Sequence, residues 1–465
     1  MKLPSLKFSG ISPGKFLQLP FSRFHFKEKN ETPGLGLKSV KGIFKNRTPG
    51  QVVIQLTDRC NAKCPQCEMR VTNRFKRSKL SVDDIKRILD SCAEREVGAV
   101  SVTGGEPCLY FDELVEVLRY AGEIGIPYLR TGTNGFLFRG HDKPGFEKKI
   151  HKIAEKLSKT NIYTFWISID SADPDTHEKM RGLPQVIRGI EKALPIFREY
   201  GIYPAANLGI NRNVGGYIES LYDDSPFDPE KFRETFTQSF EAFYRLVSDL
   251  GFTITNACYP MSGGDLDAAY YAYATDKVIH FSRREKWCVF KALYDVIPKF
   301  RDRLRIFSPR VSLLGMIRKY SGKDDESYPC RGGIDYFFID AASGDVFPCG
   351  YRGSENLGKL WDLNRTELKA DFECRRCDWE CFRDPSELFG PVLSVANHPK
   401  ALAVKLFEDI EFFKIWIEDL RYYRACDFFN GRKAPDYGKL RKISAPEKDE
   451  SLSVPAIRRA RRRSA

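Results

Sequence analysis

Three cysteines with metal-binding spacing stand close together in the sequence. Cys60, Cys64 and Cys67 follow an apolar run, residues 52–56, whose β-branched side chains predict a buried strand. Three thiolates on one loop leave a four-coordinate zinc site one ligand short. They can instead hold three irons of a [4Fe–4S] cluster and leave the fourth iron open to a small molecule. A zinc knuckle completed by a distant ligand, or ordinary free thiols, are the alternatives.

The strand followed by CNAKCPQC, residues 60–67, resembles the cluster loop of radical S-adenosylmethionine (SAM) enzymes. The resemblance implies that the open iron binds the amino and carboxylate groups of SAM. An electron from the cluster then cleaves SAM, and the resulting 5′-deoxyadenosyl radical takes a hydrogen atom from the substrate. One departure is Gln66, because the family often has an aromatic residue before the third cysteine. This departure puts one contact to adenine in doubt and leaves the cluster prediction intact.

A glycine-rich turn follows the second predicted strand. It contains Gly104, Gly105, Glu106 and Pro107, and glycines let a backbone approach a ligand closely. Taken alone, Gly-Gly-Glu-Pro is an ordinary turn signal. It resembles, however, the motif of the same family whose backbone and acid receive the amino group of SAM.

Polar residues also stand where the next three predicted strands end. Asn134 follows the third strand, Ser168 and Asp170 the fourth, and Asn207 lies on the fifth. The resemblance implies that they contact the carboxylate and ribose of SAM. The alternative is that they cap helices and form turns, as these residue types often do.

A second cysteine group lies later in the chain and contains Cys330, Cys349, Cys374, Cys377 and Cys381. The residues between the first two predict a β-hairpin that turns at residues 342–344 and brings those two cysteines together. Spacing alone leaves zinc bound by four of the five as an alternative. The group resembles a shortened SPASM/twitch auxiliary domain, which implies one further [4Fe–4S] cluster. Which four are ligands stays open. Four scattered cysteines, Cys92, Cys258, Cys288 and Cys426, are read as core thiols.

Strand and helix patterns alternate from residue 51 to about 260. Strands are predicted at 51–57, 98–103, 128–133, 163–170, 202–210 and 252–259, with helices at 81–95, 111–125, 145–158, 185–200 and 230–249. Such alternation implies parallel βαβ units of an α/β fold, whose ligands bind at the C-terminal strand ends. The resemblance implies a partial (β/α)6 barrel, with a small cysteine-rich auxiliary-cluster domain and a C-terminal helix.

Five segments follow from these patterns. They are an N-terminal extension (1–46), the core barrel (47–262), a helical insertion (263–322), the auxiliary-cluster domain (323–392), and a C-terminal helix with a basic tail (393–465). The helix is predicted at about 400–424. It carries one stripe through Leu402 and Leu406 and a second, aromatic stripe through Phe412 and Trp416, so one stripe could face a partner.

The net charge of +13 is concentrated at the two ends. Residues 1–46 carry nine Lys/Arg and two Glu, and residues 451–465 carry five Arg and no acid, so the remaining 404 residues sum to only +1. Basic ends favour an anionic surface, and the apolar residues of the N-terminal extension favour a membrane. No signature of specific nucleic-acid binding is present. Thirteen cysteines, eight of them in two metal-type groups, predict reduced thiols and therefore a cytoplasmic protein. Together with the basic ends, this predicts a protein that lies peripherally at the inner face of the membrane.

The interpretation is a radical SAM oxidoreductase or transferase with two [4Fe–4S] clusters and SAM as cofactors. The resemblance implies a flavodoxin- or ferredoxin-type electron donor and a peptide, a cofactor precursor or a lipid as substrate. The alternative is a non-catalytic zinc- or iron–sulfur-binding protein that uses its basic ends to bind nucleic acid or membrane.

Overall fold

A computed structural model describes residues 41–62, 64–67, 76–222, 226–261, 277–322, 327–364, 368 and 373–444. Most of the predicted N-terminal extension and the five arginines of the tail lie outside this part of the chain. The described part contains one nine-stranded sheet in the order β7-β6-β5-β4-β3-β2-β1-β8-β9. All neighbours in this sheet run parallel except β8 and β9, which pair as an antiparallel hairpin.

The first six strands form the body of the barrel. They are β1 (Gly50–Thr57), β2 (Val97–Gly104), β3 (Tyr128–Thr133), β4 (Ile162–Ser168), β5 (Ala205–Gly209) and β6 (Ile254–Cys258). Each is buried because helices cover its outer face while its inner face lines the barrel. The prediction of an α/β fold with a parallel partial barrel is confirmed.

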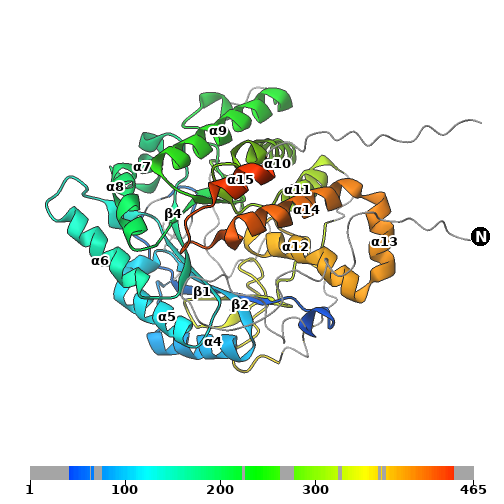
Figure 1. Ribbon diagram of the computed structural model, residues 1–465, viewed down its shortest axis with the longest axis horizontal. Coiled ribbons are helices and arrows are strands. Elements are labelled where there is room, and N and C mark those ends of the chain that lie inside the picture. The colour runs from blue at the N-terminus through cyan, green and yellow to red at the C-terminus, as the bar shows by residue number, and fades with distance from the viewer. Residues whose placement is uncertain are drawn as a thin grey trace, which may run out of the picture.

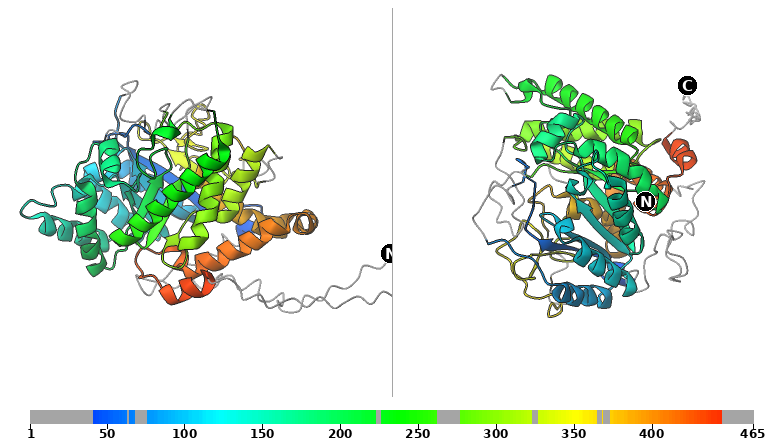
Figure 2. Two further views of the ribbon diagram at one scale, coloured as in Figure 1. Left: turned by 90° about the horizontal axis from the view of Figure 1, so that it is seen from above. Right: turned by 90° about the vertical axis from the view of Figure 1, so that its left-hand side faces the viewer.

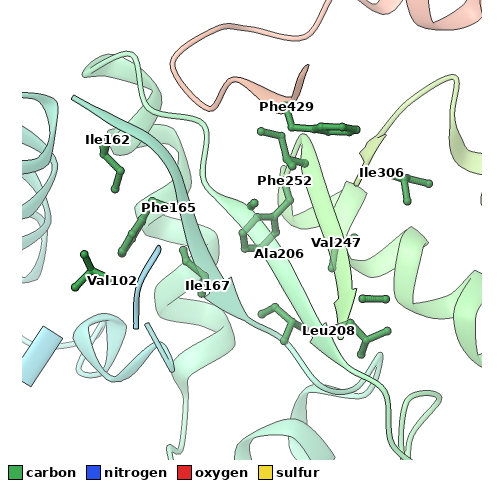
Figure 3. Packing of buried hydrophobic residues seen from close by; sticks show 14 of the residues in the cluster. Val102, Ile162, Phe165, Ile167, Ala206, Leu208, Val247, Phe252, Ile306 and Phe429 are labelled. Carbon is green, nitrogen blue, oxygen red and sulfur yellow. The ribbon is translucent and has the colours of Figure 1, made fainter. Parts of the chain in front are cut away.

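Six helices connect these strands and form an arc around the sheet (Figure 1). They are α4 (Val82–Glu94), α5 (Phe111–Glu123), α6 (Phe146–Ser158), α7 (Pro174–Arg181), α8 (Val186–Glu199) and α9 (Pro229–Leu250). Figure 3 shows how Phe165, Ile167, Ala206 and Leu208 pack in the core. They alternate along β4 and β5 with the residues that line the barrel interior.

The sheet continues beyond the six strands at both edges. The short strand β7 (Arg305–Ile306) pairs with β6, and β8 (Tyr336–Ile339) pairs with β1. The hairpin is completed by β9 (Val346–Phe347). The cysteine-rich region is therefore attached to the barrel by backbone hydrogen bonds, and the predicted hairpin between Cys330 and Cys349 is confirmed.

The remaining helices pack beside the barrel (Figure 2). They are α10 (Arg283–Val296), α11 (Arg310–Ser321), α12 (Glu380–Asn397), α13 (Pro399–Glu408), α14 (Ile410–Ala425) and α15 (Tyr437–Ser444). No helix of the described residues is both long and apolar enough to cross a bilayer.

The prediction of one helix over residues 400–424 is wrong. The backbone leaves helical geometry at Asp409 (φ −132°, ψ 62°), so α13 and α14 are separate helices. On α14 both predicted stripes pack against the rest of the protein, because Phe412, Phe413 and Trp416 are buried against α11. Of the predicted long helix, exposed large apolar side chains remain on α13 and at Ile410, the first residue of α14.

Candidate functional site

A cavity of about 460 Å³ lies inside the barrel at the C-terminal ends of its strands. All eleven residues predicted at the cysteine loop, the glycine turn and the strand ends line it: Cys60, Cys64, Cys67, Gly104, Gly105, Glu106, Pro107, Asn134, Ser168, Asp170 and Asn207. Five separate strands deliver these side chains because parallel strands end at the same edge of a sheet.

The two glycines of the turn let it pack against the cysteine loop. Gly104 has a φ of +151°, and an added Cβ would overlap the carbonyl oxygen of Thr57. A Cβ at Gly105 would overlap the carbonyl oxygen of Arg59. The amides of Gly105 and Glu106 donate to these same oxygens at 2.7 and 2.8 Å. The glycines are therefore required where the two loops meet, in addition to any approach to a ligand.

Glu106 is fully buried beneath the cysteine loop. Its carboxylate accepts hydrogen bonds from the amides of Cys108 (3.0 Å) and Asn134 (2.5 Å). Burial raises its pKa to about 7, although these donors act in the opposite direction. The acid thus joins the ends of β2 and β3, and its remaining lone pairs are available to a ligand amine.

Asn134 connects the end of β3 to the cysteine loop. Its side-chain nitrogen donates to Asn61 Oδ1 at 2.8 Å and lies 3.6 Å from the sulfur of Cys60. The same sulfur accepts the amide N–H of Ala62 at 3.5 Å. Donors aimed at a sulfur stabilise its thiolate form, which is the form that binds iron.

Asp170 is the centre of a buried charged group. Its Oδ2 lies 2.8 Å from Arg181 and accepts a hydrogen bond from Gln66 at 2.6 Å, and its Oδ1 accepts the amide of Gly209. Gln66, the departure from the aromatic residue of the family, therefore ties the cysteine loop to β4.

Arg181 is a residue of this site that the sequence analysis missed. It lies at the end of α7 and lines the cavity beside the cysteine loop. Burial raises the pKa of the Cys64 thiol to about 12, and the positive charge of Arg181 acts in the opposite direction. The sequence analysis also missed α7, although its start and end are marked in the sequence. Asp173 is the N-cap, Pro174 is the first helical residue, and Gly182 ends the helix.

These residues fit an iron–sulfur cluster with an amino-acid-like ligand. Three cysteine sulfurs, two of them beside one arginine, stand at the edge of a single cavity. The arginine offsets the negative charge that bound thiolates bring, and the strand ends supply amide and carboxylate groups.

The part of the chain that carries this site matches a known family. Residues 54–220 match the model of the radical SAM superfamily. The cysteine loop and the polar strand ends that line the cavity all lie inside this matched region. The protein is a radical SAM enzyme. Its cofactors are a [4Fe–4S] cluster and SAM.

Two individual proteins are also similar to this chain. An AdoMet-dependent heme synthase of Methanosarcina barkeri is 23% identical over 352 residues, which cover 75% of this chain and 88% of that protein. A probable GTP 3′,8-cyclase of Methanococcus maripaludis is 30% identical over 195 residues, which cover 38% of this chain and only 60% of the cyclase.

Two solved structures are also partly similar to this chain. Streptococcus suis SuiB is 19% identical with a TM-score of 0.45, over 67% of this chain and 63% of SuiB. Native anSMEcpe with bound AdoMet is 16% identical with a TM-score of 0.44, over 83% of this chain and 100% of anSMEcpe.

Four cysteines of the second group lie close together, and the fifth, Cys381, lies apart from them in the wall of the cavity. Cys330 and Cys374 lie on paired segments, where the amide of Cys330 donates to the carbonyl of Cys374 at 2.9 Å. Burial raises the pKa of Cys330 to about 12, and the neighbouring thiols of Cys377 and Cys374 add to this effect. Burial also raises the pKa of Cys349, and the same thiols again contribute. These four sulfurs therefore lie close together, and none of them lines the cavity.

Backbone amides point at the sulfurs of this group of four. Gly332 donates to Cys330 and Tyr351 donates to Cys349, each at 3.4 Å. Within the described residues, however, no three His, Cys, Asp or Glu side chains are placed to hold a single metal ion.

Cys381 differs from the other four. It lies in the first turn of α12, lines the cavity, and donates its thiol to Glu380 Oε1 at 3.5 Å. Burial and the carboxylate of Glu380 raise its pKa well above the usual value. Cys258, at the end of β6, faces the same carboxyl group from the other side. The reading of Cys258 as an incidental core thiol is therefore incomplete, because it lines the cavity.

Proposed function

We propose that this enzyme reductively cleaves SAM at a [4Fe–4S] cluster held by Cys60, Cys64 and Cys67, and modifies a substrate bound in the barrel cavity. The observation that carries this proposal is that all three cysteines line one cavity with the polar strand ends. When bound and reduced, the cluster would supply the electron that splits SAM into methionine and a 5′-deoxyadenosyl radical.

The residues of the chain have separate tasks in this proposal. Glu106 fixes the ends of β2 and β3 beneath the cysteine loop and offers acceptors to the amino group of SAM. Asn134, Ser168, Asp170 and Asn207 present polar atoms toward the remainder of SAM. Arg181 provides a cation near the cysteines, suited to a carboxylate.

We also assign the auxiliary [4Fe–4S] cluster to Cys330, Cys349, Cys374 and Cys377. Their mutual proximity and the amide donors at two of their sulfurs support this choice among the five cysteines. Cys381 is left out because its thiol donates to Glu380 and faces the cavity instead. A flavodoxin- or ferredoxin-type protein is the proposed electron donor to the enzyme.

The substrate is a peptide, a cofactor precursor or a lipid. The names of two relatives, a heme synthase and a GTP cyclase, support a cofactor-type small molecule among these three.

The formation of 5′-deoxyadenosine tests the proposed function. Anaerobic wild-type enzyme with a reductant and SAM is expected to produce 5′-deoxyadenosine, measured by liquid chromatography. The variant C60A/C64A/C67A loses the three thiolates and is expected to produce none, while C92A, which changes a buried thiol outside the cavity, keeps the activity. Equal yields from wild type and the triple variant would refute the assignment. A colourless, zinc-containing wild type without activity would favour the non-catalytic alternative.

We further propose a cytoplasmic location at the surface of an anionic membrane. The basic, apolar N-terminal extension and the arginine tail that suggested it lie outside the described residues. Support comes from α13, where no side chain that the structure describes is buried and where Val404, Leu406 and Phe407 are 55%, 43% and 76% exposed. Phe44, where the described chain begins, is 68% exposed, and the carbonyl of its neighbour Ile43 is held by Asn397 at the end of α12.

Apolar side chains gathered at one place on a surface indicate an interaction site. The N-terminal extension enters the fold beside α12 and α13 and carries a charge of +7 over residues 1–46. Positive charge next to exposed Phe, Leu and Val is the combination that binds anionic lipid headgroups.

A further inference from the structure

Arg130 is a charged side chain inside the barrel that the proposed reaction leaves unused. It lies on β3, where it pairs in register with Ser101 of β2 and Thr164 of β4. It is partly buried and lines the cavity. Among the described residues no carboxylate forms an ion pair with it, and its Nε has no hydrogen-bond acceptor. Burial lowers its pKa.

The acids of the cavity are engaged elsewhere. Asp170 pairs with Arg181, and Glu106 accepts the amides at the ends of β2 and β3. Asp384 accepts from Ser312 (2.6 Å) and Tyr259 (3.2 Å) through Oδ1, while its buried Oδ2 has no hydrogen-bond partner among the described residues and forms no ion pair with Arg130. Glu380 accepts the amide of Tyr259 at 3.2 Å and the thiol of Cys381. Burying even part of an arginine without a counter-ion is costly, which favours an anion from outside the chain as its partner.

Arg130 lies nearer the start of β3 than the residues that meet the cysteine loop. It precedes Asn134, which contacts Cys60, by four residues, or about 13 Å along an extended chain. Gly132 lies between them on the same face of β3, where an added Cβ would overlap Trp166 of β4. The hydroxyl-bearing Ser101 also lines the cavity beside Arg130.

We infer that Arg130 binds an anionic group of the substrate, a carboxylate or a phosphate, and so directs the rest of the substrate toward the cysteine loop. The planar guanidinium offers two parallel donors to such a group, and Ser101 can add a third. The inference rests on the proposed function, because it names the substrate class for the same cavity. Arg130 is thus a binding and positioning residue.

Binding of small anions to the cluster-loaded full chain tests this inference without any turnover. The probes are inorganic phosphate and propionate, with propionamide as the neutral control, all at constant ionic strength. Binding is measured by isothermal titration calorimetry. We expect at least one of the two anions to bind wild type, and the stronger of them identifies the group. The anion concentration at half-saturation should rise at least tenfold in R130Q and by a smaller factor in R130K. Variant R188Q changes an arginine that is 73% exposed on α8, and it should bind like wild type.

Thermal unfolding of the ligand-free variants gives the second readout. Removing an unpaired buried charge should leave the melting temperature of R130Q equal to or above that of wild type. Anion binding that is unchanged in R130Q would overturn the inference. Anion binding that weakens in C381S as much as in R130Q would also overturn it, because the Cys381 thiolate would then be the partner of Arg130. Absence of anion binding in a wild type that still forms 5′-deoxyadenosine would refute this inference alone.

Discussion

At the scale of single residues, the site depends on a buried pair whose members come from different elements. Asp170 follows β4, Arg181 ends α7, and their side chains are 1% and 9% exposed. Gln66 of the cysteine loop shares the same carboxylate oxygen. The pair therefore positions the loop that carries Cys60, Cys64 and Cys67 relative to β4.

Removing one partner of this pair should be costly. R181L leaves Asp170 buried without its cation, and we expect the protein to lose roughly 3 to 5 kcal/mol of stability. R181K keeps the charge but has no planar fork, so it should retain more stability and show weakened SAM affinity. Thermal unfolding and equilibrium binding of SAM measure the two effects, with R188Q as the surface control. Unchanged SAM affinity in a folded R181L would contradict the place of Arg181 in the SAM site.

At the scale of elements, the strands of the barrel could be predicted because their signal is local. Residues 50–57 are buried throughout, and the apolar run that predicts β1 reflects this burial. The start of α4 is likewise fixed locally, because the hydroxyl of its N-cap Ser81 accepts the amide N–H of Asp84 at 3.0 Å. Arg181 and Arg130 could not be assigned in this way, because their importance depends on which strands and helices surround them.

The break at Asp409 shows where local periodicity misleads. The apolar stripe of residues 402–420 continues through the break, but Arg318 of α11 fixes Asp409 at the start of α14. Asp409 also accepts the amide of Phe412 at 3.1 Å as an N-cap. A long-range ion pair and a cap thus override the pattern of a continuous helix.

The stability that Asp409 contributes should depend on pH. Burial alone raises its pKa, but Arg318 and the Phe412 amide outweigh burial and lower the pKa below its usual value. A lowered carboxylate pKa gives stability that is present above the ordinary value of about 3.9 and is lost as pH falls through the folded-state value. D409N keeps a good cap and removes the ion pair, so at pH 7 it should cost about 1 kcal/mol.

Thermal unfolding of cluster-free protein between pH 7 and pH 3 measures this dependence. The melting temperatures of wild type and D409N should converge as the pH drops below the ordinary aspartate pKa. A difference that stays constant over this range would show that the charge of Asp409 does not stabilise the break between α13 and α14.

At the scale of the whole molecule, two neighbouring strands of one sheet carry the two cysteine groups. Strand β1 leads into the first group, and β8 pairs beside it and belongs to the second. Gln51 of β1 donates to the carbonyl of Cys381, so α12 begins inside the barrel. The two proposed clusters are therefore attached to the same sheet, and the cavity lies between the first cysteine group and α12. The boundaries of the five segments stay predictions.

Membrane binding belongs to this scale, because it combines α13 with both ends of the chain. Full-length protein is expected to sediment with anionic vesicles at low salt, and to bind less at high salt or to neutral vesicles. Deleting residues 1–40, or introducing V404E/F407E on α13, should reduce binding. Y217E changes a side chain that is 66% exposed away from α13 and should have no effect. Full-length protein that stays in the supernatant with anionic vesicles at low salt would end the proposal.

The central claim is that SAM binds the cluster of Cys60, Cys64 and Cys67 and no other. Electron paramagnetic resonance of the reduced enzyme, with iron counted in the same sample, tests it most directly. Two clusters predict about eight irons per chain, and SAM should change the signal of only one of them. C60A/C64A/C67A should keep about four irons and lose the SAM response, whereas C330A/C349A/C374A/C377A should keep that response. A SAM-dependent change that persists in C60A/C64A/C67A would contradict the claim.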